Sequence, residues 1–285
     1  MNHKQQFVVL LKSYTDSFLY ALHRADYDIA SANIHKLRVA TRRLMSINCI
    51  IDVLSNDGYS TAIKKELKKV IKILNPMRDT QVQIKIVGKA IENGDDIEEF
   101  YLYLLNQEKK YLDKYNAPNR SQTSFYKIST LLLWQKQYTE THIAKDKFGN
   151  TSIIQAFENT EKELKLRIEN VNKSDDETIH ELRLITKRYR YMVEIIAKLF
   201  PENQIHIKEL KRLQNSMGKI QDLHVLLLEL DRYILKNIKF LRPNLTMFRD
   251  SLIADKQHRI NILMNILQEY HPPKIENYFK KLEYF

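Results

Sequence analysis

The sequence contains few of the residues that make turns and cross-links. Its 285 residues include five glycines, six prolines and one cysteine, Cys49. Few turn-forming residues mean few turns, so we expect a small number of long helices. A single cysteine excludes an internal disulfide and a cysteine-based zinc site, and it is typical of a reducing compartment.

Long hydrophobic runs are also missing. No apolar stretch approaches the roughly 20 residues that a membrane-spanning helix needs. The first residues, MNHKQQFVVLLKSY, hold an apolar run that Lys12 interrupts, and no small-residue cleavage site follows it. We therefore expect an all-α cytoplasmic protein with no signal peptide and no membrane insertion.

Positive charge is in excess. The chain has 46 Lys and Arg against 35 Asp and Glu, a formal net charge of +11. Such a balance predicts a polyanionic partner, whether nucleic acid, an anionic membrane surface or polyphosphate.

One segment of the sequence occurs twice. Residues 34–45 read IHKLRVATRRLM and residues 179–190 read IHELRLITKRYR, with six identities in the first ten positions. A second block, residues 66–82, aligns without gaps onto residues 209–225. Two repeats in the same order predict two similar helical half-bundles, residues 1–146 and 147–285, related by a pseudo-twofold axis.

Each copy of the repeat has an apolar side and a cationic side when it is drawn as a helix at about 100° per residue. Almost no acid interrupts the cationic side, which favours anion binding over an ordinary solvated surface. The apolar sides, which we expect to be buried, are Leu37, Ala40, Leu44, Ile47 and Ile51 in the first copy and Leu182, Ile185, Tyr189, Met192 and Ile196 in the second.

Apolar spacing and turn residues predict the helix boundaries. We expect a first helix over residues 2–24, and then the helix of the first repeat as far as residue 54. A lysine-rich helix over 64–74 should end at Asn75-Pro76, with Arg78 and Asp79 opening the next one. Further helices are expected over 96–115, around Trp134, over 151–171, from an N-cap at Ser174, Asp175 or Asp176 to about 200, and over 244–270 and 274–284.

The motif H-x-x-R-x-x-x-[RK]-R resembles the CHAD family, the conserved histidine α-helical domain. It occurs twice, each time before a basic helix and an acidic residue, and the resemblance covers essentially the whole chain. It implies two antiparallel bundles of the four-helix type around a basic central groove. It also implies non-catalytic binding of inorganic polyphosphate, with association with polyphosphate granules as a further expectation.

The resemblance also assigns residues. The polyphosphate-binding residues of the two motifs would be His35, Arg38, Arg42 and Arg43, and His180, Arg183, Lys187, Arg188 and Arg190. Arg78 and Asp79 match the family's Arg-Asp pair, and Asp222 matches it in the second copy. Basic residues on the neighbouring helices would widen the surface, although each alone is more often an ordinary solvated side chain: Lys68, Lys69, Lys72, Lys208, Lys211, Arg212 and Lys219.

These residue types suit polyphosphate, a flexible chain of charges with no bases to read. Arginine can donate two bonds to one phosphate, and lysine supplies point charges. His35 and His180 could donate to phosphate, or Asp79 or Asp222 could hold them as orienting elements. We interpret both aspartates as buried partners that orient an arginine or a histidine rather than as catalytic bases.

Three other functions remain open from the sequence. A basic helical protein can bind nucleic acid through its charge alone, although the scattered tyrosines suggest no stacking platform. An enzyme could use a motif histidine as a phosphoryl acceptor, but no glycine-rich phosphate loop or clustered carboxylates accompany it. A protein–protein scaffold would need an exposed apolar patch. We expect no catalytic residue, no metal site and no cofactor, and the oligomeric state stays open.

Overall fold

A computed structural model describes residues 3–55, 59–116, 121–138, 150–199, 207–237 and 243–270. In these ranges the chain forms nine α-helices and no strand, which confirms the predicted all-α fold. No helix in them is long and apolar enough to cross a bilayer. The predicted helix over 274–284 lies outside the described residues. The helices are α1 (His3–Tyr27), α2 (Ser31–Ser55), α3 (Tyr59–Glu92), α4 (Glu98–Asn116), α5 (Ser121–Tyr138), α6 (Asn150–Glu169), α7 (Asp176–Leu199), α8 (Ile207–Lys236) and α9 (Pro243–Glu269).

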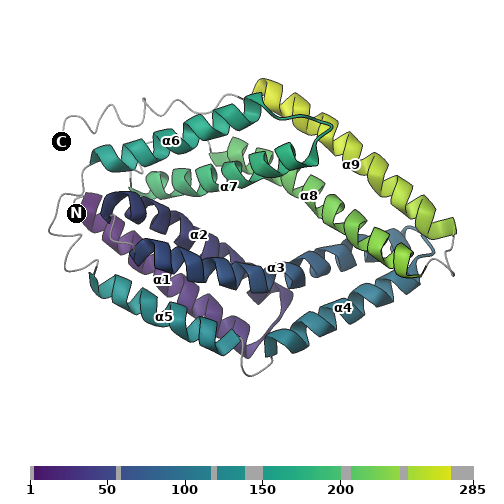
Figure 1. Cartoon of the computed structure of the whole chain (residues 1–285), viewed down its shortest axis with the longest axis horizontal. Coiled ribbons are helices and arrows are strands. Elements are labelled where there is room, and N and C mark those ends of the chain that lie inside the picture. Colours follow the sequence, from purple (N-terminus) through teal and green to yellow (C-terminus); the bar gives the residue numbers. More distant parts are fainter. Residues whose placement is uncertain are drawn as a thin grey trace.

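The helices pack in an order that occurs twice. α1 packs on α2, α2 on α3 and α3 on α4, and in the same way α6 packs on α7, α7 on α8 and α8 on α9. The two series meet where α2 contacts α7 and α3 contacts α8, and α5 lies against α1 and α3 (Figure 1). This order follows the internal repeat of the sequence. The pseudo-twofold relation and the division at residue 146 stay predictions.

Two clusters of buried apolar side chains hold the helices together. The larger contains the predicted apolar faces of α2 and α7, and every residue of those two faces is buried. The smaller joins α4 to the second half of α3, the second half of α8 and the first half of α9. In it the rings of Phe100 and Tyr233 lie 5.2 Å apart between centroids. Both clusters contain side chains from both halves of the sequence.

The structure corrects one predicted helix boundary. Asn75-Pro76 does not end a helix, because α3 runs through Pro76 without interruption. A proline inside a helix costs about 3 kcal/mol, since it removes a backbone hydrogen bond and crowds the preceding turn. Leu74 and Met77 on either side of it are buried in the larger core, and this packing outweighs the local cost. Asp79 therefore lies in the middle of a long helix and not in a first turn.

Candidate anion-binding site

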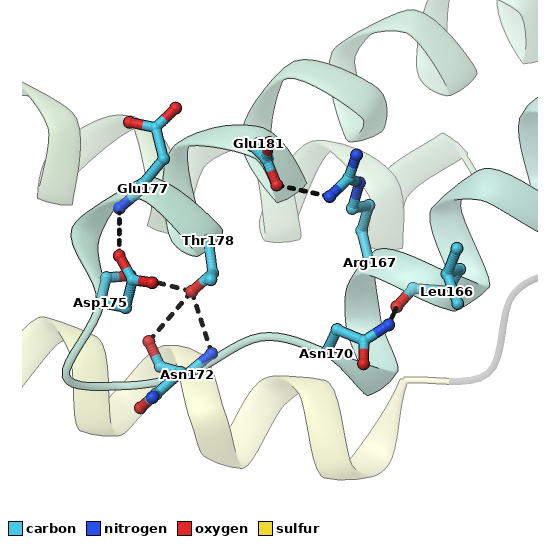
Figure 2. A network of polar contacts seen from close by, with 8 residues as sticks. All are labelled: Leu166, Arg167, Asn170, Asn172, Asp175, Glu177, Thr178 and Glu181. Carbon is cyan, nitrogen blue, oxygen red and sulfur yellow. Dashed lines mark hydrogen bonds and ion pairs between the residues drawn. The ribbon is translucent and has the colours of Figure 1, made fainter.

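The turn between α6 and α7 fixes the start of the helix that carries the second motif. The Oδ1 atom of Asp175 accepts a hydrogen bond of 2.9 Å from the backbone N–H of Glu177, so Asp175 caps the helix as expected. The Thr178 hydroxyl donates to the Asp175 carbonyl oxygen (2.9 Å) and accepts from the N–H of Asn172 (3.0 Å) (Figure 2). These bonds order the first turn of α7, directly before the motif's cationic residues.

The two motifs also share an internal contact. The Thr41 hydroxyl donates to the Leu37 carbonyl oxygen on α2, and the Thr186 hydroxyl donates to the Leu182 carbonyl oxygen on α7, both at 2.7 Å. All four residues are buried. The repeat seen in the sequence is therefore a repeat of local structure as well.

α2, α3, α7 and α8 meet around a polar hollow of about 130 Å³, which we call the central hollow. Three matched pairs of the sequence repeat line it together: Arg38 with Arg183, Asp79 with Asp222, and Val82 with Val225. The structure thus brings both motifs and both aspartates to one place. The lining residues are Arg38, Arg42, Asn75, Asp79, Val82, His180, Arg183, Gln221, Asp222 and Val225.

The cations of the central hollow are poorly hydrated. Burial, reinforced by Arg42, lowers the pKa of Arg38 to about 10. Arg38 keeps one protein partner, because its guanidinium donates to the Asn75 side-chain oxygen at 2.5 Å. Burial and then Arg42 also lower the pKa of Arg183. The Nε atom of Arg183 is buried and has no hydrogen-bond partner among the residues that the structure describes.

Lys187 does not line the hollow, but it lies close enough to the arginines that do for their charges to act on its amine. It is buried, and its pKa falls to about 6 because of that burial and of the neighbouring Arg42 and Arg183. Near pH 7 this amine is therefore mostly uncharged.

The two aspartates do not balance this charge. Burial raises the pKa of Asp79 and of Asp222, and the surrounding arginines act in the opposite direction. Four arginines act on these two carboxyl groups, and Lys187 acts on Asp222 when it is protonated; the arginines are Arg38, Arg42, Arg78 and Arg183. The site is therefore a partly desolvated cluster with an excess of positive charge, which an anion would stabilise.

The two histidines occupy different environments. The Nδ1 atom of His180 lies 2.8 Å from Oε1 of Gln221, so an amide and not an aspartate orients this ring. His35 lies in a groove between α1 and α2. Burial and the charge of Arg78 lower the pKa of His35, which favours its neutral form.

A basic lining continues outward from the central hollow between α3, α8 and α9. A space of about 800 Å³ shares Val82 and Asp222 with the hollow. It shares Lys219 and Arg259 with a further space of about 590 Å³ between α8 and α9. We call the two spaces together the outer groove. Its basic residues are Arg78, Lys85, Lys89, Lys208, Lys211, Arg212, Lys219 and Arg259.

Sequence reasoning missed three of these basic residues. Lys85 and Lys89 follow Arg78 along α3 by about two and three helical turns, so continuing the helical wheel beyond the motif would have found them. Arg259 lies in α9, far from either motif, and no sequence signal pointed to it. It is also paired with Asp255 at 3.0 Å.

Some predicted contacts lie away from the central hollow and the outer groove. Three exposed lysines of α3 are in this group, and one of them, Lys69, pairs with Glu66 at 2.9 Å. Arg43 lines the groove between α1 and α2. The three lysines are Lys68, Lys69 and Lys72.

Two arginines of the second motif already have carboxylate partners. Arg188 is exposed and lies 3.5 Å from Glu163. Arg190 is buried, donates from Nε to Gln214 at 2.6 Å and pairs with Glu194. The charge of Arg190 is therefore neutralised by a partner within the protein. Its counterpart in the first copy is Met45.

Comparison with solved structures shows the same architecture in two other proteins. The crystal structure of the CHAD domain from the plant Ricinus communis superposes with a TM-score of 0.72 at 19% identity, covering 96% of this chain and 94% of that one. PptA from Streptomyces chartreusis gives a TM-score of 0.73 at 12% identity, covering 94% of this chain and 99% of that one. At these identities the likeness concerns the fold alone.

Comparison with curated proteins found no match. The family model of the CHAD domain matches residues 10–231, which is most of the sequence. The match contains both motifs, both aspartates, the whole of α2, α3 and α7, and α8 as far as residue 231. The chain therefore belongs to the CHAD domain family.

Proposed function

We propose that this protein binds inorganic polyphosphate in the central hollow and along the outer groove, and does not hydrolyse it. One observation carries the proposal: four arginines act on only two carboxyl groups in a partly buried space, beside a lysine whose amine burial keeps mostly uncharged. A polyanion entering this space would return charge to Lys187 and give the buried Nε atom of Arg183 an acceptor.

Polyphosphate suits the lining better than nucleic acid does. CHAD domains are a polyphosphate-related family. Among the described residues that line the central hollow and the outer groove, the buried Phe248 is the only Phe, Tyr or Trp. Single-stranded nucleic acid binds through bases stacked on exposed aromatic rings, and such rings would be needed here. A chain of phosphates needs only the cations.

Two features support binding without hydrolysis. Asp79 and Asp222 are buried among arginines, whose charges partly offset the rise in carboxyl pKa that burial causes, and we interpret both carboxyl groups as partners that orient these arginines rather than as catalytic acids or bases. Metal-assisted phosphate hydrolysis uses clustered donor side chains. Within the described ranges, no three His, Cys, Asp or Glu residues gather in that way. We expect no release of phosphate when the protein is incubated with polyphosphate.

The experiment is a calorimetric titration with long-chain polyphosphate at about 150 mM salt, where surface charges are largely screened. Wild type is compared with Arg42→Gln/Arg183→Gln. The matched control is Lys109→Gln/Lys110→Gln, which removes two exposed charges on α4. Circular dichroism shows that each variant is folded.

We expect tight binding by the wild type and the control, at least tenfold weaker binding by Arg42→Gln/Arg183→Gln, and no displacement by excess duplex DNA. If DNA displaces the ligand and both variants bind like the wild type, the protein has only a general basic surface and the proposal is wrong.

A further inference from the structure

We propose that the groove between α1 and α2 is a second subsite for polyphosphate, which long chains occupy and short chains do not reach. This inference rests on the proposed function, because it assumes that the same polymer enters the central hollow. The sequence repeat does not account for this groove, since it is built partly from α1 residues that lie outside both repeated blocks.

The groove has the chemistry of an anion site. Its volume is about 400 Å³, and no carboxylate is among the described residues that line it. The outer groove, in contrast, contains Asp95, Asp222 and Asp255. Hydroxyl and amide groups add neutral polar atoms. The basic lining residues are Arg24 from α1 and His35, Lys36 and Arg43 from α2.

Two of these cations have no acidic partner among the described residues. Within the part of the chain that the structure describes, neither Arg24 nor Lys36 forms an ion pair within 4.0 Å. Arg43 lies 3.9 Å from Glu194, but that carboxylate also pairs with the buried Arg190. The positive charge of the groove is thus largely uncompensated.

Tyr14 of α1 gives the groove a polar group that stays uncharged. The ring of Tyr14 is buried, and its burial raises the pKa of the phenol to about 12, so the hydroxyl remains a hydrogen-bond donor. Lys198 from α7 lies over the same ring, 4.8 Å from its centroid. The hydroxyl of Tyr14 can donate to an anion in the groove, and the nearby positive charge of Lys198 adds to the attraction.

α2 separates the groove from the central hollow and carries cations toward both. Arg38 and Arg42 line the hollow, whereas Lys36 and Arg43 line the groove. His35 lines the groove and is close enough to Arg38 and Arg42 for their charges to lower its pKa, after the larger effect of burial. A polyphosphate chain that leaves the hollow past His35 meets its next cations in the groove.

The test compares tripolyphosphate with chains of about 100 phosphates. The variant is Arg24→Gln/Lys36→Gln, which changes two exposed side chains, and the control is again Lys109→Gln/Lys110→Gln. Relative to the control, we expect about tenfold weaker binding of the long chain and a change of less than twofold for tripolyphosphate. The negative slope of log affinity against log salt for the long chain should become shallower by about 1.4, for two lost phosphate contacts.

The inference is overturned if the long chain binds Arg24→Gln/Lys36→Gln as tightly as it binds the control. It is also overturned if tripolyphosphate binding falls as much as long-chain binding, because the groove would then be a primary site for any small phosphate. If the wild type binds neither ligand, the proposed function is wrong, and the proposed subsite is wrong as well. The wild-type result therefore separates failure of the function from failure of the subsite.

Discussion

At the scale of single residues, Lys187 couples folding to pH. Its pKa falls from 10.5 to about 6 because it is buried beside Arg42 and Arg183. A base with a lower pKa in the folded protein binds fewer protons there than in the unfolded chain. Stability therefore rises with pH between about 6 and 10.5 at this residue, and the cost of burying the amine is greatest at the acidic end of that window.

Lys187→Met should therefore stabilise the protein at pH 7, because the folded chain no longer has to release a proton. The gain should shrink as pH rises, by up to about 1.4 kcal/mol per pH unit. Urea unfolding of wild type and variant at pH 7 and at pH 9.5 measures this. An equal gain at both pH values would contradict the lowered pKa.

Polyphosphate binding should be accompanied by proton uptake at the same residue, since a nearby anion favours the charged amine. Calorimetry at pH 7.5 in two buffers of different ionisation enthalpy should show uptake of up to about one proton per site. Lys187→Arg, which stays charged, should bind without that uptake. Equal proton uptake by wild type and Lys187→Arg would mean that a group other than Lys187 binds the proton.

The sequence located the cations at this scale but not their surroundings. The repeat identified Arg38, Arg183 and the two aspartates as partners, and the structure places them around one hollow. It could not show that Lys187 is buried, because burial on a cationic face depends on helices distant in the chain. For the same reason, the sequence could not show that Arg190 pairs with Glu194 and Gln214.

At the scale of helices, α3 joins the first motif to the outer groove. Its uninterrupted course through Pro76 places Asn75 beside Arg38 and carries Arg78, Lys85 and Lys89 into the outer groove. Helix propensity predicted a break here, since proline disfavours the preceding turn. The helix continues because the residues on both sides of Pro76 pack in the core. Helix propensity depends on local sequence alone and does not include such packing.

Asn75→Ala should destabilise the protein by about 1–3 kcal/mol, because the buried Arg38 guanidinium loses its acceptor. Chemical denaturation measures the change, and Gln257→Ala on an exposed face of α9 serves as the control. A change in unfolding free energy no larger than that of the control would mean that the hydrogen bond between Arg38 and Asn75 does not stabilise the fold.

At the scale of the whole molecule, both apolar cores contain residues from both halves of the sequence. The central hollow exists only because α2 and α3 meet α7 and α8, so neither half alone contains the site. The internal repeat predicted that two similar units would combine. The outer groove depends on how α3, α8 and α9 diverge, and the sequence pattern holds no information on that divergence.

The excess charge of the assembled site should make binding strongly dependent on salt. By analogy with single-stranded nucleic acid, each phosphate contact adds about −0.7 to the slope of log affinity against log salt. Arg42→Gln/Arg183→Gln should make that negative slope shallower by about 1.4, and Lys109→Gln/Lys110→Gln should leave it unchanged. Titrations at several salt concentrations measure the slopes, and equal slopes for the two variants would contradict a localised site.

The most direct test of the central claim is a crystal structure of the protein with long-chain polyphosphate. We predict phosphate density in the central hollow, within hydrogen-bonding distance of Arg42 and of the Nε atom of Arg183, continuing into the outer groove. Density confined to the exposed lysines of α3, with none in the hollow, would contradict the claim.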